Sequence, residues 1–137
     1  MTAHETRLRV RYAETDQMGL VYYANYFVWM EVGRAEYCRA AGIVYRDLEL
    51  ETGLYLAVAG AQCRYLAPAR YDEEIAVHTT IGSANRRMIE FQYEIRRGQD
   101  LLATGSTRHI FLNRNMKPES LPERYWPAFG IPIRDRT

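Results

Sequence analysis

Residues 88–96 alternate strictly between apolar and polar side chains, with apolar residues at Ile89, Phe91, Tyr93 and Ile95. Successive side chains of a strand point to opposite faces of its sheet. The pattern therefore predicts a half-buried strand that is apolar on one face and polar on the other. Another element of the chain must cover that apolar face.

Four other segments have the composition of strands; they are residues 7–12, 54–66, 74–81 and 101–112. The first of them places Leu8, Val10 and Tyr12 on one side and arginines on the other, which predicts a second half-buried strand. Proline or glycine lies between the later segments, as expected where short turns join neighbouring strands.

Residues 22–41 have a helical period, with Tyr26, Met30, Gly33 and Tyr37 three or four positions apart. Gly42 can take the left-handed conformation that often ends a helix. A glycine in mid-helix, such as Gly33, costs about 1 kcal/mol relative to alanine. We therefore expect another element to pack very close to the helix at Gly33.

Shorter helical segments are expected at residues 45–51 and 121–126. One strand, one long helix and then four strands joined by short turns predict an α+β fold. In this fold an antiparallel sheet of about five strands covers a single central helix. The length of 137 residues predicts one domain over residues 1–137.

Composition excludes several classes of partner. The formal net charge is +1, so no overall field attracts nucleic acid or an anionic membrane. No apolar run is long enough to predict a membrane span, and the first residues do not resemble a targeting signal. With only two cysteines and no disulfide framework, we expect reduced thiols and a cytoplasmic location.

The sequence does not predict a metal site. His4, His78 and His109 are far apart, and the two cysteines do not have the spacing of metal ligands. A phosphate-binding glycine loop and a serine-hydrolase motif are also missing. We interpret Cys38 and Cys63 as core residues, because buried structural thiols are commoner than nucleophilic ones.

The stretch TDQMGLVYYANY, residues 15–26, places Asp16 and Gly19 just before the expected helix. Asp16 has two possible roles. As a turn or cap residue it would accept hydrogen bonds from free backbone N–H groups, and the local pattern alone favours this reading. As a functional residue it would face a ligand beside the helix N-terminus, with Gly19 allowing a sharp bend of the backbone.

Several segments together resemble the 4-hydroxybenzoyl-CoA thioesterase-like family of acyl-CoA thioesterases, which have the hotdog fold. They are residues 11–26 (RYAETDQMGLVYYANY), 31–34 (EVGR), 65–73 (YLAPARYDE) and the pairs 117–118 (KP) and 121–122 (LP). The resemblance covers nearly the whole chain. It implies a sheet wrapped around the long helix, in agreement with the order of elements predicted above.

The resemblance implies hydrolysis of an acyl-CoA thioester to a free carboxylic acid and coenzyme A. Asp16 takes the position of the family's catalytic carboxylate, as either nucleophile or general base. The backbone amide of Tyr23 takes the position of the donor that polarises the thioester carbonyl. Many relatives have histidine where this chain has Tyr23, whereas others have tyrosine there. Coenzyme A is part of the substrate, so no cofactor is expected.

The resemblance also implies a binding site near the helix start, where Gly19, Tyr22 and Tyr26 are the expected substrate-binding residues. Aromatic residues at such a position are more often core residues than pocket walls. Arg86 and Arg87 match positions where relatives hold the nucleotide of coenzyme A, although a solvated turn is the commoner role of such a pair.

A five-stranded sheet has exposed edges, so we expect a homo-oligomer, a dimer or a homotetramer. Two other functions stay open. A hotdog hydratase or dehydratase would need a histidine with an acidic partner in the site. A non-catalytic acyl-CoA-binding module would use Asp16 only as a turn residue.

Overall fold

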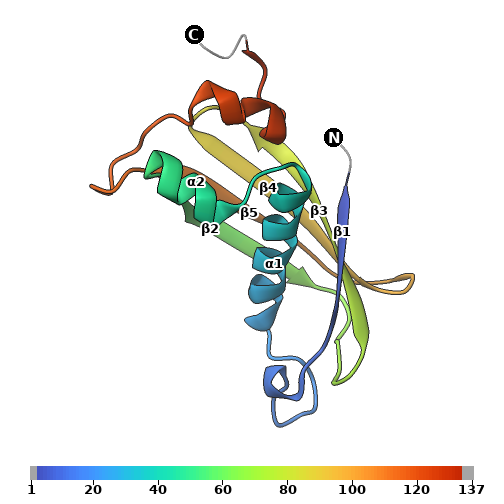
Figure 1. Ribbon diagram of the computed structural model, residues 1–137. Coiled ribbons are helices and arrows are strands. Elements are labelled where there is room, and N and C mark those ends of the chain that lie inside the picture. The colour runs from blue at the N-terminus through green and yellow to red at the C-terminus, as the bar shows by residue number, and fades with distance from the viewer. Residues whose placement is uncertain (1–2, 134–137) are drawn as a thin grey trace.

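The computed structural model describes residues 3–133, in which a five-stranded antiparallel sheet packs against one long helix (Figure 1). The elements follow in the order β1 (His4–Arg9), η1 (Tyr12–Glu14), α1 (Asn25–Ala40), α2 (Tyr45–Thr52), β2 (Tyr55–Tyr65), β3 (Glu74–Ala84), β4 (Met88–Arg97), β5 (Asp100–Leu112) and η2 (Glu123–Phe129). Here η1 and η2 are 3₁₀ helices. None of the helices among these residues is long and apolar enough to cross a membrane.

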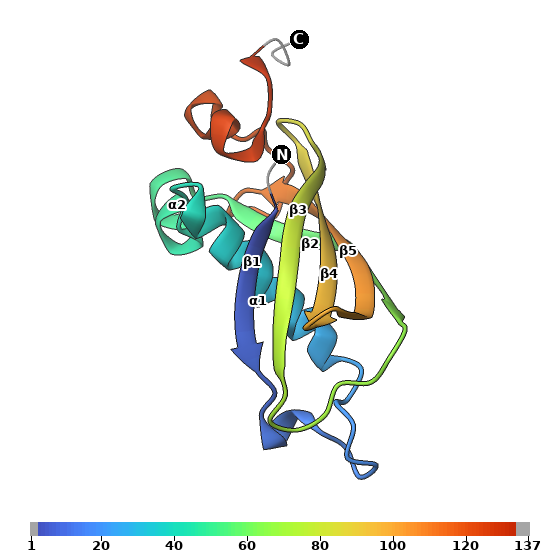
Figure 2. The ribbon, with the colours of Figure 1, turned by 90° about the vertical axis from the view of Figure 1, so that its right-hand side faces the viewer.

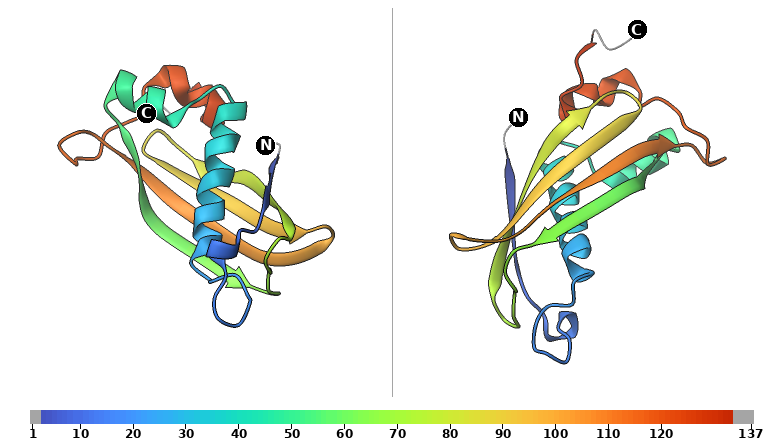
Figure 3. Two further views of the ribbon diagram at one scale, coloured as in Figure 1. Left: turned by 60° about the horizontal axis from the view of Figure 1, so that its bottom comes forward. Right: turned by 180° about the vertical axis from the view of Figure 1, so that it is seen from behind.

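The strands lie in the order β1-β3-β4-β5-β2, and every neighbouring pair is antiparallel. β1 and β2 are therefore the two edges of the sheet, although they are consecutive strands in the chain. The connection between them contains η1, α1 and α2, and α1 crosses one face of the sheet (Figure 3). The predicted α+β architecture, an antiparallel sheet of five strands covering one long helix, is confirmed.

The four later strands begin and end within three residues of their predicted limits. The first strand was predicted over residues 7–12 but ends at Arg9. Tyr12 instead begins η1 and is 76% exposed, so its predicted place on the apolar side of a strand is wrong. The chain turns here because Arg11 and Glu14 close η1: the Glu14 N–H donates to the Arg11 carbonyl at 3.0 Å, and the Arg11 N–H donates to the Glu14 carboxylate at 2.8 Å.

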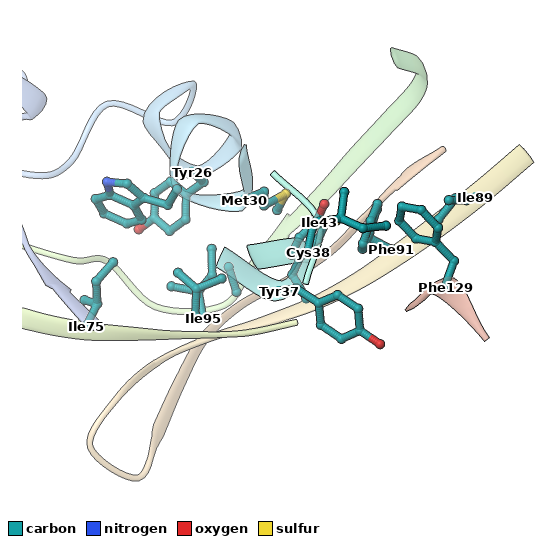
Figure 4. Packing of buried hydrophobic residues seen from close by; sticks show 14 of the residues in the cluster. Tyr26, Met30, Tyr37, Cys38, Ile43, Ile75, Ile89, Phe91, Ile95 and Phe129 are labelled. Carbon is teal, nitrogen blue, oxygen red and sulfur yellow. The ribbon is translucent and has the colours of Figure 1, made fainter. Parts of the chain in front are cut away.

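The core lies between α1 and the sheet face that it covers (Figures 2 and 4). On α1 the predicted face is buried, at Tyr26, Met30, Gly33 and Tyr37. On β4 the four apolar residues of the alternating pattern are all buried, at Ile89, Phe91, Tyr93 and Ile95. The apolar face that the two-residue period predicts on β4 and the one that the 3.6-residue period predicts on α1 are therefore both buried in the same core.

Helix and sheet are in close contact at two glycines, Gly33 and Gly105. A Cβ atom built on Gly33 would come within 2.6 Å of Thr79 Oγ1 and 2.7 Å of Val77 Cγ1 on β3. On β5, Gly105 leaves the space that the Met30 side chain occupies. The expectation of close packing at Gly33 is confirmed. Gly42, at φ +90°, follows the helix in the left-handed conformation that was predicted.

A polar group is enclosed in this core. His109 on β5 is fully buried, and its Nε2 lies 2.7 Å from Thr107 Oγ1. The same hydroxyl is 2.6 Å from the Tyr93 hydroxyl on β4. Burial lowers the pKa of His109 to about 4, and the positive charge of Arg34 acts in the same direction. The imidazole is therefore neutral at pH 7.

We predict that Gly33→Ala destabilises the protein by about 1–2 kcal/mol, because the added methyl group overpacks the contact with β3. Helix propensity alone predicts the opposite sign, a gain of about 1 kcal/mol. Urea unfolding monitored by circular dichroism measures the difference. Gly60→Ala is the control, since a Cβ there meets nothing closer than the Arg108 Cβ at 4.0 Å. A stabilised Gly33→Ala variant would contradict the close packing.

We also predict that stability falls as the pH is lowered from about 6.5 to about 4. The folded pKa of His109 lies below that of an accessible imidazole, so between these values the unfolded chain binds more protons. The slope from this one group is at most about 1.4 kcal/mol per pH unit, and the total up to about 3 kcal/mol. Urea unfolding at several pH values tests this. The slope should be smaller in His109→Gln, and an unchanged slope would contradict the prediction.

Candidate functional site

The predicted site residues around Asp16 lie at one end of the sheet, where the segment before α1 meets the loop between β2 and β3 (lower end of Figure 2). Residues 14–16 and 20–22 form a short antiparallel ribbon, with a bridge between Thr15 and Val21. Leu20 on this ribbon also bridges to Arg70 in the β2–β3 loop. The β2–β3 loop, about 50 residues further along the chain, therefore helps to hold the ribbon in place.

Asp16 lies at the tip of the ribbon and is half-buried. Its Oδ1 accepts hydrogen bonds from the N–H groups of Met18 at 2.8 Å and Leu20 at 3.3 Å. Gly19, at φ +79°, closes the turn between them. Within residues 3–133 the second oxygen, Oδ2, has no hydrogen-bond donor. The carboxylate thus serves the turn with one oxygen and leaves the other available to a ligand.

The start of α1 offers two free donors. The Asn25 N–H donates to the Tyr22 carbonyl at 2.9 Å, and the Tyr26 N–H donates to the Tyr23 carbonyl at 3.3 Å. These bonds give Tyr23 and Ala24 a helical turn conformation, yet neither of their own N–H groups has an acceptor in the described part of the chain. Unpaired N–H groups of this kind, together with the helix dipole, favour negative charge at a helix start.

The aromatic cluster at the helix start divides into two pairs. Tyr22 and Tyr23 are exposed, with ring centroids 4.8 Å apart. Tyr26 and Trp29 are buried in the core, and the Tyr26 hydroxyl accepts a hydrogen bond from the Ala69 N–H at 3.3 Å. Tyr22 is therefore accessible to a ligand, whereas Tyr26 supports the site from within the core.

Glu14 is a buried residue that the sequence analysis did not single out. Its carboxylate accepts hydrogen bonds from the Arg11 N–H at 2.8 Å and from Trp29 Nε1 at 3.0 Å. Its carbonyl accepts from the Tyr22 N–H at 2.8 Å and from Asn25 Nδ2 at 2.9 Å. Glu14 thereby ties the ribbon to the first turn of α1. No local signal could have identified it, since a glutamate two residues before an aspartate in a polar segment is usually exposed.

Arg86 and Arg87 lie in the turn between β3 and β4, at the opposite end of the sheet from Asp16 (Figure 2). The Arg86 carbonyl accepts a hydrogen bond from the Leu121 N–H at 2.8 Å, which fixes this turn to the C-terminal segment. The 16 residues of α1 are about 24 Å long. One copy of the chain therefore does not bring the arginine pair close to Asp16.

Histidine and cysteine do not add a further reactive group beside Asp16. His78 Nε2 lies 3.2 Å from a Glu5 carboxylate oxygen, on the face of the sheet away from α1. Cys38 is buried, and burial raises the pKa of its thiol to about 11, so it stays protonated. Both cysteines are free. Within residues 3–133, no three His, Cys, Asp or Glu side chains are grouped so as to hold a metal ion.

A broad groove lies elsewhere in the molecule. It has a volume of about 720 Å³ and crosses the polar outer face of the sheet, where His78, Gln92 and Ser106 are among its lining residues. None of the predicted site residues lines it. We therefore place the candidate functional site at the Asp16 end of the sheet because of its chemical groups and not because of cavity size. A carboxylate and two backbone N–H groups without acceptors among residues 3–133 occur together there.

Comparison with known proteins adds independent information. The family model of the thioesterase superfamily matches residues 18–104, beginning two residues after Asp16. YneP of Bacillus subtilis is 38% identical over 120 residues, 86% of each chain. The acyl-CoA thioesterase YbgC of Haemophilus influenzae is 28% identical over 123 residues, covering 89% of this chain and 90% of its own. The crystal structure of a DHNA-CoA thioesterase from Staphylococcus aureus has a TM-score of 0.87 and is 34% identical, with 95% of this chain and 87% of that chain covered.

Proposed function

The chain belongs to the thioesterase superfamily and has its hotdog fold, and we propose that it hydrolyses acyl-CoA thioesters to a free carboxylic acid and coenzyme A. The family and the names of the relatives support the reaction class. The proposal for this chain rests on the Asp16 ribbon. Among residues 3–133, Asp16 Oδ2 has no hydrogen-bond donor, and the Asp16 N–H donates to the Leu20 carbonyl within the ribbon that leads into α1. The helix start that follows has two N–H groups without an acceptor in the same residues.

Asp16 has two chemical routes to the products. As nucleophile, its free oxygen attacks the thioester carbonyl carbon, the C–S bond breaks, and coenzyme A leaves as a thiolate that takes a proton from water. Water then hydrolyses the mixed anhydride and restores the carboxylate. As general base, Asp16 instead removes a proton from the attacking water, and that proton passes to the leaving sulfur. Both routes consume one water and need no cofactor.

The Tyr23 amide is proposed as the donor that stabilises negative charge on the thioester oxygen. Its N–H is unpaired among residues 3–133 and lies at the positive end of the α1 dipole. One such donor is worth about 3 kcal/mol in the transition state when water is excluded. Because the donor is backbone, a change of the Tyr23 side chain alone would leave it in place.

Substrate contacts are assigned by accessibility. Gly19 and Tyr22 are exposed and are proposed to touch the acyl-CoA, while Tyr26 is proposed to support the floor of the site. Arg86 and Arg87 remain proposed phosphate contacts. From their end of the sheet they would meet a substrate held at Asp16 only if its pantetheine arm spanned the sheet or if a second copy of the chain supplied them.

A homo-oligomer in the cytoplasm is part of the proposal. β2 is an 11-residue edge strand whose outer edge has no partner among the described residues, and most of its side chains are exposed. An open edge of this length favours pairing with another chain. The free thiols Cys38 and Cys63 agree with a reducing compartment.

The alternative hydratase or dehydratase reaction has little support. Of its two possible histidines, His78 lies on the outer face of the sheet and His109 is buried beside Thr107. Neither has a hydrogen bond or ion pair with the Asp16 ribbon. A binding module without catalysis remains the alternative that an experiment must separate from hydrolysis.

We predict that Asp16→Asn lowers kcat for thiol release at least about 100-fold while the protein still binds acyl-CoA. Asparagine keeps the Oδ1 acceptor for Met18 and Leu20, so the turn is preserved and only the charged oxygen is lost. Thiol release from short, long and aromatic acyl-CoA substrates, with binding measured by calorimetry, tests this and begins to define the acyl group.

Asp72→Asn is the matched control, because Asp72 is an exposed loop aspartate at the same end of the molecule. It should retain activity. If Asp16→Asn turned over as fast as the unchanged protein, Asp16 would be only a turn residue. Binding of acyl-CoA by the unchanged protein without any thiol release would favour the binding module.

For the assembly, we predict a particle of two or four chains by light scattering coupled to gel filtration. The unpaired edge of β2 provides the physical reason. A particle with the mass of one chain at assay concentration would contradict the proposed homo-oligomer and any site shared between copies.

A further inference from the structure

Tyr65, the last residue of β2, lies against the start of α1. Its ring makes edge-on contacts with two tyrosines, with centroids 5.0 Å from Tyr26 and 6.4 Å from Tyr23. Its hydroxyl donates a hydrogen bond to the Tyr23 carbonyl at 2.9 Å. Burial raises the pKa of this hydroxyl, which therefore remains a proton donor at neutral pH.

The hydrogen bond from Tyr65 acts on one particular peptide group. The Tyr23 carbonyl and the Ala24 N–H belong to the same planar peptide unit, so fixing the carbonyl also fixes the direction of that N–H. The carbonyl accepts two bonds, from the Tyr65 hydroxyl and from the Tyr26 N–H. Hydrogen bonds to a carbonyl polarise the peptide and strengthen its N–H as a donor.

That N–H is available. Ala24 is exposed and has helical dihedral angles, φ −66° and ψ −22°. The N–H groups of Tyr23 and Ala24 are consecutive, and among residues 3–133 neither donates to an acceptor. Two adjacent donors at a helix start can hold a single oxygen that carries negative charge.

We propose that Tyr65 is a positioning residue: its hydroxyl orients the Tyr23–Ala24 peptide so that the Ala24 N–H becomes a second donor, beside that of Tyr23, to the thioester carbonyl oxygen. This inference rests on the proposed hydrolysis. Tyr65 does not itself exchange a proton with the substrate. Its effect belongs to the transition state, where charge accumulates on the oxygen, and much less to binding of the uncharged carbonyl.

The test compares Tyr65→Phe with Tyr55→Phe. Both substitutions remove one hydroxyl and keep the ring; the two tyrosines begin and end β2 and are 41% and 43% exposed. The Tyr55 hydroxyl has no hydrogen bond within the described residues. For Tyr65→Phe we expect kcat to fall about tenfold with KM changed less than twofold, and the pH profile to keep its shape. The Ala24 amide should also shift in a ¹⁵N-correlated NMR spectrum. Tyr55→Phe should behave as the unchanged protein.

An unchanged kcat, or an unmoved Ala24 amide, would overturn the proposal. A Tyr65→Phe variant with a raised KM and a nearly unchanged kcat would also overturn it, because Tyr65 would then be a binding contact. An altered pH profile would overturn it as well, because Tyr65 would then be a proton donor. If the unchanged protein released no thiol from any acyl-CoA, the hydrolysis itself would fail and this role with it. If Asp16→Asn abolished turnover but Tyr65→Phe did not lower it, hydrolysis would stand and the positioning role alone would fall.

Discussion

The contact between α1 and the sheet is the constraint on which the rest of the structure depends. The helix crosses the sheet from one edge strand to the other and covers the buried sides of the strands beneath it. At Gly33 it comes so close to Val77 and Thr79 that even a methyl group lacks space. Close packing of this kind leaves the helix one depth and one orientation, and this fixes where its N-terminus emerges.

The candidate site follows from that fixed helix start. Glu14 joins the ribbon to Trp29 and Asn25 on α1, so Asp16 is carried on a segment anchored to the helix core. Tyr65 joins the end of β2 to the same helix start. The Asp16 carboxylate lies on a loop, but these hydrogen bonds fix that loop to the packed helix and sheet. Preorganised donors and charges stabilise a transition state because they need not reorganise during the reaction.

Much of the fold could be predicted from the chain alone, since alternation at Ile89, Phe91, Tyr93 and Ile95 and the helical spacing of Tyr26 and Met30 are local patterns with a physical cause. Asp16 could be chosen from its motif, and the turn at Gly19 from its residue type. Tyr12, in contrast, was misplaced, because hydrogen bonds between Arg11 and Glu14 close η1 there, and Glu14 is held in place by the distant Trp29. The β-propensity of a segment depends on its own residue types and does not predict a partner that is distant in the sequence.

The sequence by itself determined which faces of the strands and of the long helix are apolar, and that the helix packs closely against another element at Gly33. It also contained the motif in which Asp16 lies. Only the tertiary structure decided that Asp16 uses one oxygen, Oδ1, to close its own turn and that Glu14 is buried. It also decided that Tyr65 reaches the Tyr23 carbonyl and that Arg86 and Arg87 lie at the far end of the sheet. The physical reason is range. Periodicity reflects neighbours along the chain, whereas hydrogen-bond partners 15 to 42 residues apart, such as Glu14 with Trp29 and Tyr23 with Tyr65, exist only after the sheet has closed over the helix.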